Sequence, residues 1–488
     1  MAALVRGGAL TLGGSLLGRA ASVAQSIVIA RGLDPHRLGV FAILNYVLGL
    51  AGAIVDLGVP VAVAKLVAEY RVTRPTALRR IVGIFAGASF VLATAGALLL
   101  LAGAAPLSQF YREPALAPLF RLAAALLFVS LMGAFLASAV QGFQRIDALA
   151  AVTAVKAVVA LGATLALLPS LELVGVIVAS IVAEAIAWPL VARPLRQALA
   201  ATPGARADAV AAGPVVARAL ALSVPVVLNG LVVWGGAWFV RSYLARTAGY
   251  EAVGYFHVAD ACARLLLLLP SAIAVPFLPA MSEAVALGRD ATSRMVEGGL
   301  RLTLLAAAPA GAFLCLAAES VLGVVYGEAY AGPAASLTSA LVLAAGCQAV
   351  AVMVWSALVG AGRTWAGFVV HAGGQLILVT LTVALVPAHG LTGLAAAAIV
   401  GSLATAGLGL TVVRAGIGLR FTAVRNALGV SVIAWAAAGA LWVSGVTGWL
   451  EGAALAAGVA VFQFHQLTPA ERRSVLERLR RPVAEAAR

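Results

Sequence analysis

The chain has 488 residues, of which 63% are hydrophobic and only 11% are charged. Soluble globular proteins carry about 25% charged residues, so this sequence has too few polar side chains to cover a surface that faces water. The composition excludes a mainly soluble protein and predicts an all-α integral membrane protein. The formal net charge of +14 is explained by basic loops facing the cytoplasm and by anionic lipid, so we expect no nucleic-acid partner.

Apolar stretches follow one another along almost the whole chain. A membrane-spanning helix needs about 20 largely apolar residues, and the sequence between polar breaks provides about 14 such transmembrane helices. In chain order they cover residues 8–30, 38–62, 81–104, 115–140, 148–168, 173–191, 217–241, 252–280, 300–323, 334–360, 366–387, 391–413, 427–446 and 449–465.

The basic residues predict the orientation of these spans. If the N-terminus is cytoplasmic, 23 of the 33 Lys and Arg residues lie in inner loops or the tail. The outer loops hold only four, namely Arg31, Arg37, Arg112 and Arg246. Since cytoplasmic loops are enriched in Lys and Arg, we expect a multi-pass protein of the inner (cytoplasmic) membrane with both termini in the cytoplasm.

Two pairs of segments resemble each other at nearly the same spacing. IARGLDPHRLGVFAI (29–43) resembles LARTAGYEAVGYFHV (244–258) at an offset of 215, and SAVQGFQRID (138–147) resembles SALVGAGRTW (356–365) at an offset of 218. The offset spans six predicted helices, an even number, so both copies cross the membrane in the same direction. This predicts two six-helix lobes in a pseudo-twofold repeat, a known transporter plan. The alternative is shared loop chemistry at helix ends.

The repeat divides the chain into four parts. We expect a first six-helix lobe over residues 1–200, a second over 215–414, an extra C-terminal transmembrane helix pair over 427–465 and a basic amphipathic cytoplasmic tail over 466–488. The tail combines a capping box with an apolar stripe beside arginines, so we expect it to bind anionic membrane lipid. A plain solvated tail is the alternative.

Three segments resemble a known family. They are IARGLDPHRLGVFAI (29–43), DLGVPVAVAKLVAEY (56–70) and QGFQR (141–145). Their pattern is an arginine ending the first helix, a short turn, a glycine-aromatic start to the second helix and an Asp-Leu-Gly near its inner end. With this pattern the chain resembles the multidrug, oligosaccharidyl-lipid and polysaccharide exporter superfamily, and within it the polysaccharide-type flippases.

This resemblance implies a flippase that moves polyprenyl-pyrophosphate-linked oligosaccharide across the cytoplasmic membrane by alternating access, for surface polysaccharide biosynthesis. It implies two lobes around a central cavity, with proteins of polysaccharide assembly as partners. A cation-coupled multidrug exporter of the same fold is the alternative, and it predicts acidic cavity charges. The sequence has no phosphate-loop, HExxH, CxxC or GxSxG motif, so we expect no enzyme, no cofactor and no metal.

Arg19 lies near the middle of the first predicted span. It comes twelve residues before Arg31, which places it about 18 Å below the outer interface. A charge at such a depth costs about 2.5–3.5 kcal/mol and needs a partner, water or a ligand. No carboxylate lies three or four residues away. We interpret the guanidinium as a binding group for the pyrophosphate; the alternative is an ion pair with Glu184.

Further polar residues in the spans fall into two groups. Arg264, Arg241, Asn45 and Asn229 are predicted to line the headgroup cavity with Arg19; in the alternative, Arg241 extends outward to the interface and the asparagines bond neighbouring helices. Lys156 and Glu184 lie at similar depth on consecutive spans, and Asp260 lies four residues before Arg264. Each pair is expected to be either a coupling site for a proton or sodium ion or a structural ion pair.

Two further features lie near helix ends and kinks. Asp56 is interpreted as a helix-end residue near the inner interface rather than a site. Pro270, Pro276 and Pro279 lie in one predicted span, where they remove backbone hydrogen bonds. We predict a hinge there, with a static kink packed by neighbouring helices as the alternative.

Overall fold

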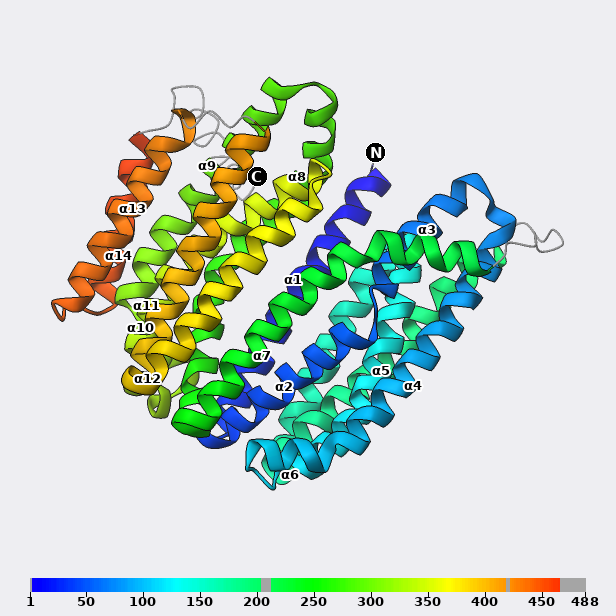
Figure 1. The fold of residues 1–488 in the computed structure, drawn as a ribbon, viewed down its shortest axis with the longest axis horizontal. Helices are drawn as coiled ribbons and strands as arrows, with labels where there is room; N and C mark the ends of the chain where they lie inside the picture. Colours follow the sequence, from blue (N-terminus) through cyan, green and yellow to red (C-terminus); the bar gives the residue numbers. More distant parts are fainter. Residues whose placement is uncertain (1, 203–211, 418–421, 466–488) are drawn as a thin grey trace. The chain divides into compact units, whose positions relative to one another are not determined.

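The computed structural model describes residues 2–202, 212–417 and 422–465. In these ranges it contains helices and no strand (Figure 1). Nine of the described helices are long and apolar enough to cross a membrane. Three of these fold back at a kink, and each of the 14 predicted spans coincides with a helix, half of a folded helix or a pair of successive helices. The predicted all-α membrane fold is therefore confirmed. The predicted tail lies outside the described residues.

The chain forms two compact units, residues Met1–His257 and Val258–Arg488. The first unit has a core of α3, α4 and α5 residues that includes Leu66, Leu78, Ile81 and Phe135. Its elements are α1 (Ala2–Gly32), α2 (Pro35–Val55), α3 (Val59–Thr73), η1 (Pro75–Ala77), α4 (Leu78–Tyr111), α5 (Leu116–Gly142), α6 (Ile146–Ala200) and the larger part of α7 (Ala212–Arg264).

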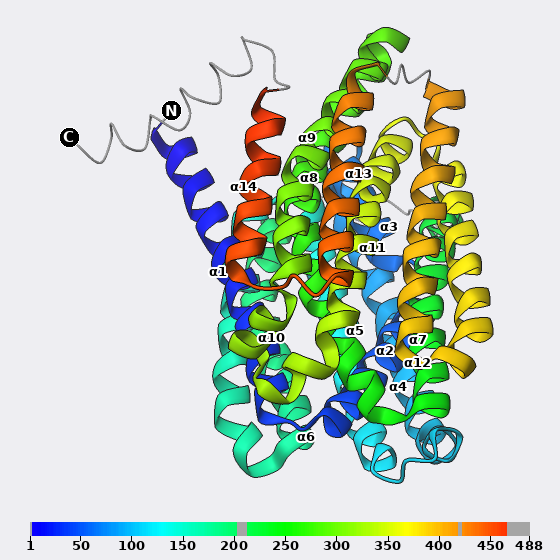
Figure 2. The same cartoon turned by 90° about the vertical axis from the view of Figure 1, so that its left-hand side faces the viewer.

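The second unit contains the end of α7 and the elements that follow it. Its core joins α8, α9 and α11 through Met281, Leu300 and Met353. Both C-terminal helices pack on α9, as Figure 2 shows. The elements are η2 (Leu265–Leu267), α8 (Leu268–Ala286), α9 (Arg289–Leu316), α10 (Ala318–Tyr326), α11 (Glu328–Gly360), α12 (Thr364–Ile417), α13 (Thr422–Val443) and α14 (Trp449–His465).

Local sequence explains the turn between α1 and α2. Asp34 has extended backbone angles (φ −70°, ψ 163°), and its side chain accepts a hydrogen bond from the backbone N–H of Arg37. The distance is 2.9 Å. Pro35 follows at the first helical position, where its missing N–H costs nothing and its fixed φ favours the helix. The Asp-Pro pair thus begins α2 at a defined residue.

Two hairpin kinks lie at the same offset as the sequence repeat. Glu172 in α6 has φ 50° and ψ −127°, and Gly390 in α12 has φ 55° and ψ −131°. The residues are 218 positions apart, the offset of the second pair of similar segments. The same rare backbone conformation therefore folds each of these long helices into two antiparallel halves.

A reciprocal contact joins residues that are related by the offset of 215, that of the first pair of similar segments. A side-chain carbon on Gly39 would lie 1.9 Å from the backbone oxygen of Tyr250, and one on Gly254 would lie 2.0 Å from that of Pro35. Offset by 215, Gly39 corresponds to Gly254 and Pro35 to Tyr250. The start of α2 and the second half of α7 thus cross with backbone against backbone. Any side chain at either glycine would separate them.

Candidate functional site

Arg19 lies on the exposed face of α1. The neighbouring small residues pack on α6, where a side-chain carbon on Gly18 would lie 3.4 Å from Cα of Ala154. Small residues permit this close helix contact. Arg19 itself forms no ion pair or hydrogen bond with any residue that the structure describes. The alternative ion pair between Arg19 and Glu184 is therefore wrong.

Glu184 instead pairs with Lys156 across the α6 hairpin. The carboxylate is 8% exposed, and it accepts a second hydrogen bond, 3.4 Å long, from the hydroxyl of Ser130 on α5. The predicted proximity of Lys156 and Glu184 is thus present in the structure. The pair neutralises both charges, and a coupling role for it stays a prediction.

The second predicted pair lies in the other unit. Both Nε and Nη2 of Arg264 lie 3.0 Å from Oδ2 of Asp260. This is the geometry expected for residues four positions apart on a helix. The two residues end α7, directly before the 3₁₀ turn η2 and the three prolines, all of which lie in α8. The helix is therefore interrupted just ahead of Pro270, and its use as a hinge stays a prediction.

Arg241 is enclosed by aromatic rings. The residue is 3% exposed. Its Cζ lies 3.6 Å from the ring centre of Tyr46 and 4.6 Å from that of Phe256. Its Nη1 donates to the backbone oxygen of Ala237 at 3.3 Å. A cation between aromatic faces is stabilised by their quadrupoles. The alternative in which Arg241 extends outward is therefore wrong.

The two predicted asparagines lie on α2 and α7, the helices that also carry Tyr46 and Arg241. Asn45, next to Tyr46 on α2, donates to the backbone oxygen of Phe41 at 3.1 Å. This bond lies within its own helix, not between helices. Asn229 is half-buried on α7. Contacts of either residue with a sugar stay a prediction.

A cavity of about 340 Å³ lies between α2 and the first half of α7, which run side by side in Figure 1. Its lining includes Gly49, Gly52, Asp56, Gly230 and Trp234. The ring of Trp234 lies 5.9 Å from that of Tyr46, the residue that covers Arg241. A chain of contacts therefore leads from the buried guanidinium to the cavity. The described residues that line this cavity include none of the predicted headgroup residues, and the sequence had predicted neither Tyr46 nor Trp234.

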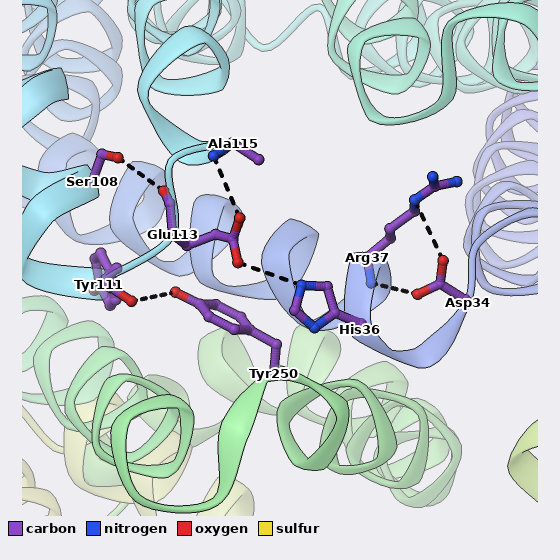
Figure 3. A network of polar contacts seen from close by, with 8 residues as sticks. All are labelled: Asp34, His36, Arg37, Ser108, Tyr111, Glu113, Ala115 and Tyr250. Carbon is purple, nitrogen blue, oxygen red and sulfur yellow. Dashed lines mark hydrogen bonds and ion pairs between the residues drawn. The ribbon is translucent and has the colours of Figure 1, made fainter.

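A polar network joins the start of α2 to the segment between α4 and α5 (Figure 3). Nε2 of His36, in the first turn of α2, lies 3.4 Å from Oε2 of Glu113 after α4. The hydroxyl of Tyr250 donates to the backbone oxygen of Tyr111 at 2.9 Å. The hydroxyl of Tyr111 lies 2.7 Å from that of Ser242. The network ties the α1–α2 and α4–α5 turns to the kink of α7 at Gly249. Its only sequence signal was aromatic residues near span ends.

A match to a family model assigns the chain to a family. A family model described as polysaccharide biosynthesis protein matches residues 4–285, more than half of the chain. The chain belongs to this family. No curated protein matches it by sequence.

Solved structures of low sequence identity share the fold. The lipid II flippase MurJ, in an inward closed conformation, has a TM-score of 0.72 at 12% identity, covering 94% of this chain and 98% of that one. An inward-facing multidrug resistance MATE family transporter of the MOP superfamily has a TM-score of 0.68 at 17% identity, covering 84% and 98%. A MOP superfamily transporter from Pyrococcus furiosus has a TM-score of 0.62 at 16% identity, covering 85% and 95%. These structures confirm the predicted multi-pass membrane fold, and the family model confirms the predicted polysaccharide-type family.

Proposed function

We propose that this protein is a flippase for polyprenyl-pyrophosphate-linked oligosaccharide, working by alternating access in surface polysaccharide biosynthesis. The family supports the pathway, and the fold shared with the lipid II flippase MurJ supports a lipid-linked substrate. The proposal places the protein in the cytoplasmic membrane with both termini in the cytoplasm, alongside polysaccharide-assembly proteins, and places anionic lipid at the tail.

The observation that carries the proposal is the isolated guanidinium of Arg19. An arginine in an apolar helix is costly without a counter-charge. Glu184 and Asp260 are the acids predicted near its depth, and they pair with Lys156 and Arg264 instead. A diphosphate supplies the missing negative charge, because its oxygens accept two hydrogen bonds from one guanidinium. A cationic drug offers Arg19 no such partner.

The other predicted cavity residues have complementary roles in this proposal. Asn45 and Asn229 offer amide groups to sugar hydroxyls, whereas the charges of Arg241 and Arg264 are already met by aromatic rings and by Asp260. The aromatic ring of Trp234 in the α2–α7 cavity provides an apolar face for a sugar ring. The polyprenyl chain needs no protein site, since it stays in the bilayer.

A reconstituted flipping assay tests the proposal. Purified protein in liposomes receives a fluorescent polyprenyl-diphosphate sugar, and the native chain is compared with Arg19→Ala and with Arg121→Ala, which removes another exposed arginine of a span. We expect rapid flipping by the native chain and by Arg121→Ala. Flipping by Arg19→Ala should fall about tenfold or more, the effect of one lost charged hydrogen-bonding pair.

The other outcomes separate the alternatives. Equal flipping by all three chains would remove Arg19 from the headgroup site and leave the flippase assignment intact. No flipping by a folded native chain, together with efflux of a cationic dye under an ion gradient, would reassign the protein as a multidrug exporter.

A further inference from the structure

The second predicted span is broken in the structure. It was expected to run without interruption over residues 38–62, but α2 ends at Val55 and α3 begins at Val59. Between them Leu57 has φ 47° and Gly58 has φ 72°. Residues such as leucine rarely adopt this left-handed conformation. Within a membrane, backbone without helical hydrogen bonds is tolerated only where protein covers it or a cavity adjoins it.

Specific contacts hold this break in place. Oδ1 of Asp56 accepts a hydrogen bond of 2.7 Å from the backbone N–H of Gly58. Ser223 on α7 donates its hydroxyl to the backbone oxygen of Gly58 at 3.0 Å. A side-chain carbon on Gly58 would lie only 2.6 Å from Cβ of Ser223. The broken segment is therefore packed tightly against α7, and the position requires glycine.

Asp56 lines two spaces at the break. One is the α2–α7 cavity of about 340 Å³, and the other is a chamber of about 10 Å³ between α2, α3, α4 and α5. About 10–15 Å³ on this measure is the room that one water molecule needs. The chamber therefore suits a single occupant of that size.

A second polar group faces the small chamber. Ser89 of α4 lines it and is 7% exposed. Its hydroxyl is buried and has no hydrogen-bond partner among the residues that the structure describes. Buried polar groups without a partner are uncommon and call for a ligand, a water or an ion. Ser89 and Asp56 thus offer two oxygen ligands to whatever occupies the chamber.

The charge around Asp56 favours a cation. Asp56 forms no ion pair with any residue that the structure describes. The residues that α4, α5 and α7 contribute to both spaces carry no other titratable group; they are Ser89, Leu92, Ala93, Leu131, Phe135, Val226, Val227, Gly230 and Trp234. The negative end of the α2 dipole and the positive end of the α3 dipole both lie at the break and oppose each other, so the unpaired carboxylate of Asp56 is what favours a cation. Broken membrane helices bind coupling ions in this way in other transporters.

We propose that Asp56 and Ser89 bind a small monovalent cation, a proton or Na⁺, at the α2–α3 break. The cation neutralises the carboxylate, and its movement down its gradient drives transport. The coupling part rests on the proposed flippase function, whereas binding of the cation does not. The site differs from the predicted coupling residues Lys156, Glu184 and Asp260, whose charges are already paired.

Carbodiimide labelling tests binding without any substrate. Dicyclohexylcarbodiimide modifies carboxyl groups in apolar surroundings, and mass spectrometry of the peptide that contains Asp56 measures the modification. If the cation is Na⁺, labelling falls when sodium chloride replaces choline chloride at constant pH. If it is a proton, labelling falls as the pH rises and does not respond to sodium.

Ser89→Ala distinguishes a built site from a reactive carboxyl alone. We expect the sodium concentration for half-protection to rise about tenfold, or the midpoint of the pH dependence to move to lower pH because the protonated carboxyl loses its acceptor. Asp147→Asn, at an exposed carboxylate in the first turn of α6, should leave the Asp56 labelling unchanged. The proposal is overturned if labelling of Asp56 depends on neither sodium nor pH. It is also overturned if Ser89→Ala changes neither the sodium concentration for half-protection nor the pH midpoint.

Transport under defined gradients tests the coupling. In proteoliposomes, flipping by the native chain should accelerate under a sodium or proton gradient, and Asp56→Asn should lose this acceleration while Asp147→Asn keeps it. Flipping that ignores both gradients overturns the coupling. If the native chain does not flip the lipid at all, the proposed function fails, and the labelling result still decides the cation site.

Discussion

Glu184 and Asp56 are both carboxylates in apolar helices of the first unit, yet their surroundings differ. Glu184 lies within a regular half of α6, paired with Lys156 and hydrogen-bonded by Ser130. Asp56 lies where a helix breaks, beside two cavities, and no described basic residue pairs with it. The first acid satisfies its charge within the protein, whereas the second leaves one oxygen for an occupant.

These two environments indicate separate roles for buried acids in such a chain. A paired carboxylate contributes to folding, because removing its partner strands a charge in an apolar setting. An acid without a partner, held at a rare backbone conformation, lowers stability unless something binds it. If the two acids follow these separate rules, substitutions around them should change the free energy of unfolding by different amounts.

The largest effect is expected from adding one methyl group at the break. Gly58→Ala forces a side chain into the left-handed region and within 2.6 Å of Ser223 Cβ, so we expect a loss of about 3 kcal/mol in the free energy of unfolding. Unfolding in mixed micelles titrated with sodium dodecyl sulfate measures it. Gly133→Ala is the matched control, since its Cβ would lie 3.0 Å from the movable Oε2 of Glu184 and should cost about 1 kcal/mol or less.

Equal losses for the two glycine variants would contradict the view that the break is the more constrained of the two sites.

Removing the partner of Glu184 comes next. Lys156→Ala leaves a buried carboxylate without its ammonium, and we expect a loss of about 2–3 kcal/mol, less than for a fully buried pair because the lysine side chain is 43% exposed. The same unfolding titration measures it. Lys156→Met combined with Glu184→Gln should recover most of the loss. A double variant no more stable than Lys156→Ala would show that the pair is not the source of the stability.

A smaller effect is expected at the unpaired acid. Asp56→Asn keeps an oxygen that can accept the 2.7 Å hydrogen bond from Gly58, and it removes a charge that nothing in the described chain neutralises. We expect a change within about 1 kcal/mol. Glu184→Gln, measured beside it, should cost more because it leaves the Lys156 ammonium without a counter-charge. A larger loss for Asp56→Asn than for Glu184→Gln would reverse the comparison.

Sequence patterns predicted the paired acid and not the unpaired one. Apolar length predicted helical segments at all 14 spans, although several of these spans are broken in the structure. Helical depth predicted that Lys156 lies near Glu184, and i, i+4 spacing predicted that Arg264 lies near Asp260. These features depend on local periodicity, which a sequence carries directly. The enclosure of Arg241 depends on rings from two other helical segments, and no local pattern contains that information.

The helix end at Asp56 was predicted, but the separate helix that begins at Val59 was missed for a related reason. The mean hydropathy of residues 38–62 predicts one continuous span that includes Asp-Leu-Gly-Val-Pro (56–60). A glycine and a proline so close together nevertheless indicate a helix end. Gly58 packs against Ser223 and Val227, and Ser223, which donates to its backbone oxygen, lies 165 residues further along the chain. No sequence pattern distinguishes Ser89 from the other small residues of α4, so its role could not be predicted.

The smallest effect on stability is expected at Ser89. Its hydroxyl is buried without a partner, so Ser89→Ala removes an unsatisfied polar atom, and the free energy of unfolding should stay level or rise by up to about 1 kcal/mol. Ser130→Ala, which removes the hydroxyl bonded to Glu184, should lower it by about the same amount. The two substitutions delete the same kind of atom, and their changes in the free energy of unfolding should differ in sign when unfolding is measured without sodium at high pH.

With sodium, or at low pH, the bound cation stabilises the native chain by mass action, and Ser89→Ala should lose part of that stabilisation. A loss of stability for Ser89→Ala under both conditions would mean that the hydroxyl is already satisfied within the protein, and the chamber would then have no need of an occupant.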